Sequence, residues 1–67
     1  MNLSQYLGKR IRLVDVDGEI TDGECVCVIP AQDNVPEIAS IDIQTKPGSG
    51  YTIGFNEDEI KSIEVIE

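Results

Sequence analysis

The chain has 67 residues, 40% of them hydrophobic, and it carries 13 acidic against 5 basic residues and no histidine, for a net charge of −8. This length allows a single domain (residues 1–67), and apolar residues spread along it argue against disorder. No apolar run reaches the roughly 20 residues of a membrane helix, and the N-terminus lacks a signal-peptide pattern, so we expect a cytoplasmic protein without a membrane partner.

A short helix is expected at the N-terminus. Asn2 can cap it, and Gly8, which tolerates positive φ, can end it. Its apolar face should hold Leu3, Tyr6 and Leu7. From residue 9 the sequence KRIRLVDV alternates apolar with basic residues, a period typical of a half-buried strand.

The segment 15–29 is expected to form a hairpin that leads into a long, bent second strand. Asp17-Gly18 is typical of a tight turn, because both central positions of that turn favour positive φ. Gly23 interrupts the strand and is expected to mark a bend. Cys25 and Cys27 should share one face of the strand as buried, reduced core side chains without a metal, since a single chain lacks the further soft ligands of a zinc site.

Three further strands are expected over residues 37–44, 51–55 and 60–67. The pattern predicts a mainly β fold, in which a short N-terminal helix precedes a five-stranded, strongly bent antiparallel SH3-like barrel. A core this small is commonly supported by assembly, and the last two strands are candidates for pairing between copies. The predicted oligomer interface consists of Tyr51, Ile53, Phe55, Ile60, Ile63 and Val65.

With these elements in place, the chain resembles the Sm-like (LSM) family, as a divergent member of prokaryotic or phage type. The likeness covers nearly the full length and rests mainly on GKRIRLVDVDGEITDGE, in which Gly18 and Gly23 match the two glycines of the family's first motif. The resemblance implies an Sm-like fold and a homo-oligomeric ring of six or seven subunits, closed by strand pairing between neighbours. It also implies RNA binding.

The RNA site that the resemblance implies is degenerate in this sequence. Counted from Gly23, the family's Asp and stacking positions fall on Ile29 and Ala31, and its Asn position falls on Asp33; a shift of one residue brings Asn34 there instead. Asp33 and Asn34 are also typical turn residues in the loop PAQDNVPE, and we favour that interpretation. The candidate RNA-binding residues are Asp33, Asn34, Lys9, Arg10 and Arg12.

An enzyme is not expected, because the chain lacks histidine and shows neither an activated nucleophile nor a catalytic pair of carboxylates; no cofactor is expected either. Two binding functions stay open. In the first, the ring binds RNA weakly and in a salt-sensitive way through the basic segment 9–12 and the loop 30–36. In the second, the ring is a scaffold that does not bind RNA and whose acidic surface attracts a basic protein partner. The positions of Lys9, Arg10 and Arg12 distinguish these two functions. If they lie near the loop they can bind phosphate, which favours RNA binding; if they pair with Asp or Glu across an interface, their role is structural.

Overall fold

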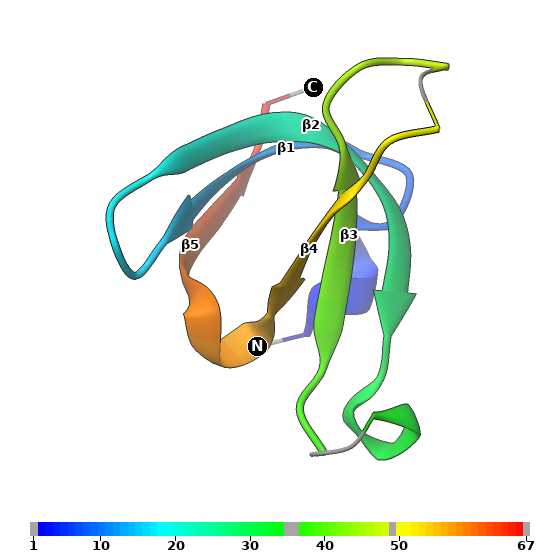
Figure 1. The fold of residues 1–67 in the computed structure, drawn as a ribbon, viewed down its shortest axis with the longest axis vertical. Coiled ribbons are helices and arrows are strands. Elements are labelled where there is room, and N and C mark those ends of the chain that lie inside the picture. The colour runs from blue at the N-terminus through cyan, green and yellow to red at the C-terminus, as the bar shows by residue number, and fades with distance from the viewer. Residues whose placement is uncertain (1, 35–36, 49, 67) are drawn as a thin grey trace.

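In the computed structural model, which describes residues 2–34, 37–48 and 50–66, the chain opens with a single 3-10 turn, η1 (Leu3–Tyr6) (Figure 1). Asn2 caps this turn by accepting a hydrogen bond from a backbone N–H at 3.2 Å, and Gly8 follows it with φ 81°. Leu3 is buried in the core, whereas Leu7 is 54% exposed. The predicted short helix is therefore present as one 3-10 turn, with Leu7 outside its buried face.

Five antiparallel strands form one sheet in the order β4-β3-β2-β1-β5, so the mainly β prediction is confirmed. The strands are β1 (Arg10–Asp15), β2 (Ile20–Ile29), β3 (Ser40–Gln44), β4 (Ile53–Asn56) and β5 (Ile60–Val65), and the 3-10 turns η2 (Ala31–Asp33) and η3 (Glu57–Glu59) follow β2 and β4. The sheet curls until its two edge strands face each other across the molecule (Figure 1). They do not pair, however, so the described sheet is not closed, which corrects the expectation of a barrel. Closure requires two edges with matching backbone groups, and β4 offers only four residues for it.

The long strand β2 turns from one half of the sheet to the other at Gly23. Its first half pairs with β1 and its second half pairs with β3. A Cβ atom on Gly23 would lie 2.5 Å from the carbonyl oxygen of Gln44 and 2.7 Å from Cγ2 of Ile43. The close approach of β3 to β2 at this position thus requires glycine, in agreement with the bend predicted there.

The core lies between the concave face of the curled sheet and η1. Alternate residues of β1 and β3 point into it, as the period of two predicts. The buried side chains are Leu3, Ile11, Leu13, Cys25, Ile41, Ile43 and Ile60.

The two cysteines differ in environment, which corrects the expectation that both thiols share a buried face. The register of β2 against β3 shifts between Cys25 and Cys27, so that one residue is inserted there. Cys25 stays in the core, but Cys27 pairs with the outward-facing Asp42 and is half-buried, and Val28 takes the inward position beside Ile41. Such a bulge reverses the faces of all residues that follow it. Both thiols are free.

Candidate assembly and nucleic-acid interfaces

The predicted interface residues fall into two groups. Three of them belong to the core or pack against it: Ile60, Phe55 and Ile63. The other three are exposed: Tyr51 (79%), Ile53 (43%) and Val65 (47%). Tyr51 precedes the first residue of β4 and so lies in the β3–β4 loop rather than in the edge strand.

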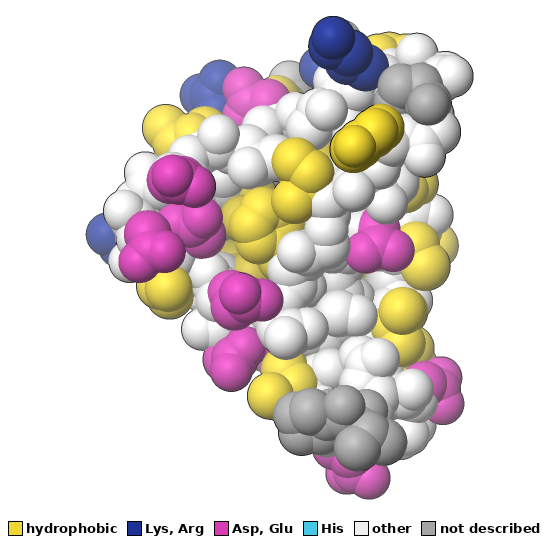
Figure 2. Space-filling view, in the orientation of Figure 1, with side chains coloured by type: hydrophobic (Ala, Val, Ile, Leu, Met, Phe, Trp, Pro, Cys, Tyr) yellow, Lys and Arg dark blue, Asp and Glu magenta, His cyan; other side chains and the backbone are white. Residues whose placement is uncertain are grey.

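The concave face of the sheet reaches the surface between β4 and β5. Ile53 pairs with the buried Ile43, and Val65 pairs with the buried Ile11, so both exposed side chains are on the core face of the sheet. We call Ile53, Phe55, Ile63 and Val65 the seam. Figure 2 shows a band of hydrophobic side chains in this region, bordered by acidic side chains on the β5 side. An apolar band of this kind is typical of a surface that another chain covers.

The outer edge of β5 offers unpaired backbone groups. Ile66 donates its N–H to the carbonyl of Arg10 at 3.0 Å, and hydrogen-bonded pairs alternate with non-bonded pairs in an antiparallel ladder. The register therefore makes Arg12 and Glu64 the next bonded pair. Ile63 and Val65 consequently direct their N–H and C=O groups away from β1, toward the open edge.

The outer edge of β4 is shorter. Glu57 donates its N–H to the carbonyl of Ala39 at 2.8 Å, which by the same alternation makes Phe55 a bonded partner of β3 and turns Gly54 toward the open edge. The N–H of Asn56 is capped by the carboxylate of Glu59 at 2.9 Å. Both edges thus present unpaired backbone positions, those of Gly54 on β4 and those of Ile63 and Val65 on β5.

Arg12 forms an ion pair with Asp22 of the same chain. Its Nε and Nη2 atoms donate to Oδ1 and Oδ2 of Asp22 at 2.9 and 3.0 Å, across the β1–β2 ladder. These hydrogen bonds hold the pKa of Asp22 below its usual value, and the hydrogen bond to Asp22, assisted by the charge of Glu64, raises the pKa of Arg12. A bidentate carboxylate occupies the geometry that a phosphate would need, so Arg12 is poorly placed to bind RNA.

The remaining basic residues of the predicted site are remote from the loop. Arg10 lies opposite Glu24 in the ladder, and the exposed Lys9 accepts a hydrogen bond from the N–H of Cys25 through its carbonyl. The loop begins at Pro30, five residues farther along β2, which corresponds to about 16 Å of strand. The structure does not bring the basic segment and the loop together.

Within the loop, Asn34 is engaged in fastening the turn. Its Nδ2 donates to the carbonyl of Ile38 at 2.7 Å and to Oγ of Ser40 at 3.3 Å, which closes the loop onto the start of β3. Asp33 ends the η2 turn and is exposed. Pro36 of the same loop lies outside the described residues. An amide that donates both protons to its own chain keeps only its oxygen as a group that could contact a base edge.

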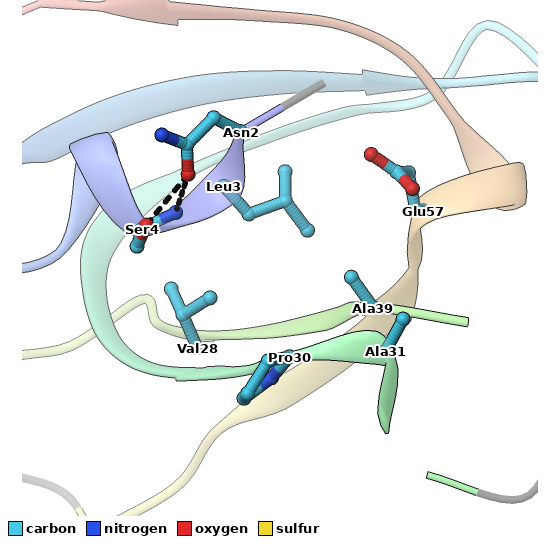
Figure 3. Close-up of a pocket in the computed structure, with 8 residues that line it drawn as sticks. All are labelled: Asn2, Leu3, Ser4, Val28, Pro30, Ala31, Ala39 and Glu57. Atoms are coloured by element: carbon cyan, nitrogen blue, oxygen red, sulfur yellow. Dashed lines mark hydrogen bonds between the residues drawn. The ribbon is translucent and has the colours of Figure 1, made fainter. Parts of the chain in front are cut away.

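A cavity of about 410 Å³ lies beneath η1, between the end of β2 and η3 (Figure 3). Its lining is mainly apolar and comes from separate segments, which is why the sequence did not reveal it: Asn2, Leu3, Ser4, Val28, Pro30, Ala31, Ala39 and Glu57. Asn2 and Ser4 hydrogen-bond to each other, and the carboxylate of Glu57 points across the cavity (Figure 3).

A second groove, of about 440 Å³, lies where the β3–β4 loop meets β4 and is lined by Thr45, Lys46, Tyr51 and Ile53. No residue of the segment 45–50 was predicted to form part of a site. A usable signal was present, however: residues 43–56 contain no acidic residue, although the chain has 13.

The described residues contain no group of three or more side chains suited to a metal ion. The described helical segments include none that is long and apolar enough to cross a membrane. Comparison with protein-family models, with curated proteins and with solved structures finds no match to this chain.

Proposed function

We propose that this chain is a non-enzymatic, cytoplasmic assembly module of Sm-like architecture, whose copies join into a closed ring through their open sheet edges. One observation carries the proposal: β4 and β5 are both edges of the same curled sheet, and the apolar seam between them is partly exposed, at Ile53 and Val65. An exposed edge with apolar side chains on its core face is a template for a strand of another chain. The resemblance to the Sm-like family supplies the expected ring size of six or seven subunits.

Pairing β4 of one copy with β5 of the next is a head-to-tail contact. Each copy added to a row covers one edge and leaves another open, so only a closed ring leaves no edge unpaired. The charge of −8 on every subunit opposes this association through repulsion. Because salt screens such repulsion, the assembly should become tighter between low and physiological ionic strength.

For the role of the ring, we favour a scaffold that binds a basic protein partner. Two contacts support this choice over RNA binding through the predicted residues, namely the Arg12–Asp22 pair and the hydrogen bonds of Asn34. The exposed acidic side chains of the loop and of η3, among them Asp33 and Asp58, add negative charge at the same end of the sheet. RNA binding that uses Lys9, Arg10, Arg12, Asp33 and Asn34 is the alternative, and its affinity would be weak and salt-sensitive.

The assembly is tested by measuring the mass of the protein in solution by light scattering, together with its circular dichroism. Val65→Pro removes an N–H that faces the open edge, at a side chain that is 47% exposed, so this variant should stay folded and lose assembly. Glu64→Pro is the matched control, because it removes a donor to β1 and should weaken folding itself. Val65→Glu places a charge in the seam at a side chain that is exposed in the free chain, and it too should yield folded monomers. A wild-type protein that stays a compact, stable monomer at micromolar concentration contradicts the proposal.

A further inference from the structure

The cavity beneath η1 places a carboxylate against an apolar wall. Its lining is mainly apolar, and Leu3, Val28 and Ala39 within that lining are buried or half-buried. Glu57 is the one charged residue among the described residues that line the cavity, and its carboxylate points across it (Figure 3). The Oε2 atom of this carboxylate is buried. The cavity therefore combines apolar surface with a negative charge that is partly removed from water.

The backbone holds Glu57 in place at the cavity wall. Its N–H donates to the carbonyl of Ala39 at 2.8 Å, which ties the start of η3 to the chain that leads into β3. The N–H of the preceding residue, Asn56, donates to the carboxylate of Glu59 at 2.9 Å, which caps the same turn. The side chain of Glu57 therefore enters the cavity from a turn that hydrogen bonds hold on both sides.

The surface around the cavity favours a cation. Two segments that contribute to its lining, 30–40 and 57–59, contain two and three acidic residues, respectively, and no basic residue. Four of these acidic residues are exposed, namely Asp33, Glu37, Asp58 and Glu59. Surface charges act over a Debye length of about 8 Å at physiological ionic strength, so this group draws cations toward the cavity.

We propose that this cavity receives a lysine side chain of a basic protein partner, with the aliphatic stem against the apolar wall and the ammonium group at the carboxylate of Glu57. Lysine covers apolar surface with its stem while its charge stays at a polar group, which is the combination that the cavity offers. A carboxylate has about four lone-pair sites, so Glu57 can accept from an ammonium group in addition to its contact within the chain. The cavity volume of about 410 Å³ lies within the range of small-ligand pockets.

The inference rests on the proposed function, because it names the side chain by which the basic partner would engage the scaffold. The described lining belongs to one chain and includes none of the four seam residues, so a monomer carries this cavity. Binding of one lysine is weak, but several lysines of one partner held by several subunits would raise the overall affinity without any new contact. The two proposals fail separately. A monomer that binds lysine refutes the ring alone, and a ring that does not bind lysine refutes this inference alone.

The test is a titration of 15N-labelled protein with N-acetyl-lysine methylamide, followed by NMR. The comparison compound is N-acetyl-norleucine methylamide, which has the same unbranched stem and no charge. We expect saturable shifts at residues 3, 28, 39 and 57 at millimolar concentrations of the lysine compound. The norleucine compound should bind roughly 10-fold more weakly or worse, the loss expected for one hydrogen bond between charged groups.

Three variants separate the charge from the cavity. Glu57→Gln should weaken binding of the lysine compound by the same factor of roughly 10 and leave the norleucine compound unaffected. Asp58→Asn is the matched control, because it makes the same change of charge at the next residue, which is exposed; it should change either affinity by less than about twofold. Ala31→Leu keeps every charge and fills part of the cavity, so it should weaken binding of both compounds.

Four outcomes would overturn the proposal. The first is equal affinity for the lysine and norleucine compounds, and the second is an equal loss of affinity in Asp58→Asn and Glu57→Gln. The third is the absence of saturable shifts at tens of millimolar of the lysine compound. The fourth is saturable binding of spermidine without binding of the lysine compound, which would assign the cavity to a free polyamine.

Discussion

Gly23→Ala is the sharpest test of how this sheet is bent. The added methyl group would lie 2.5 Å from the carbonyl oxygen of Gln44 and 2.7 Å from Cγ2 of Ile43. One of these atoms belongs to the backbone of β3 and the other to a fully buried side chain. Neither can rotate away, so β2 and β3 must move apart at the point where β2 changes partners.

The expected loss of stability follows from two opposed terms. Overpacking of a close contact costs about 1–3 kcal/mol. Replacement of glycine restricts the unfolded chain and returns about 0.4–1 kcal/mol. The variant should therefore unfold with a free energy about 1–2 kcal/mol lower than the wild type. For a domain of this size, each kcal/mol corresponds to about 4–8 °C in Tm, so a decrease of roughly 5–15 °C is expected.

Urea and thermal denaturation followed by circular dichroism measure this loss, with all proteins at one concentration because assembly would shift the transition. Gly54→Ala is the matched control: its Cβ would lie 3.0 Å from Oδ1 of Asp42, a side-chain atom that can move aside. We expect that variant to change the free energy of unfolding by less than about 0.5 kcal/mol. If Gly23→Ala unfolds at the same urea concentration as Gly54→Ala, the close approach of β2 and β3 is not what requires glycine.

The remaining predictions concern the two thiols and one ion pair. Cys27 should react with a thiol reagent in the folded protein while Cys25 reacts only on unfolding, since burial raises the pKa of the Cys25 thiol and shields it; equal rates would contradict the bulge. Cys25→Ala should cost about 1–2 kcal/mol and Cys27→Ala less than about 0.5 kcal/mol in urea denaturation. The pKa of Asp22 is held below its usual 3.8 by hydrogen bonds from Arg12, so the pair contributes its full stability above that pH and loses it as the pH falls through the lowered value. Asp22→Asn should accordingly flatten the decrease of Tm between about pH 5 and pH 2, and an unchanged slope would show that the pair does not contribute.

Local sequence patterns were sufficient for the order of the strands along the chain and for the inward faces of β1 and β3. Ile11 and Leu13 on β1, and Ile41 and Ile43 on β3, are the buried positions that a period of two predicts. The sequence also predicted the bend at Gly23, the cap of η1 at Asn2 and the glycine that follows this turn. These features depend on residues a few positions apart, and backbone sterics and side-chain alternation act over that range.

The tertiary structure decided what depends on partners far apart in the chain. All four residues of CVCV (25–28) are apolar, so both faces of this part of β2 are apolar in any register. The hydrophobic pattern therefore does not reveal the bulge that turns Cys27 outward. Arg12 meets Asp22 only because of the β1–β2 register, and Lys46 shares a groove with Tyr51 only because β3 and β4 pair as antiparallel neighbours. The open edges of β4 and β5 likewise follow from the order of strands in the sheet. Periodicity specifies which way a side chain faces, whereas register and strand order are set by the packing of the whole core, and these determine which side chains meet.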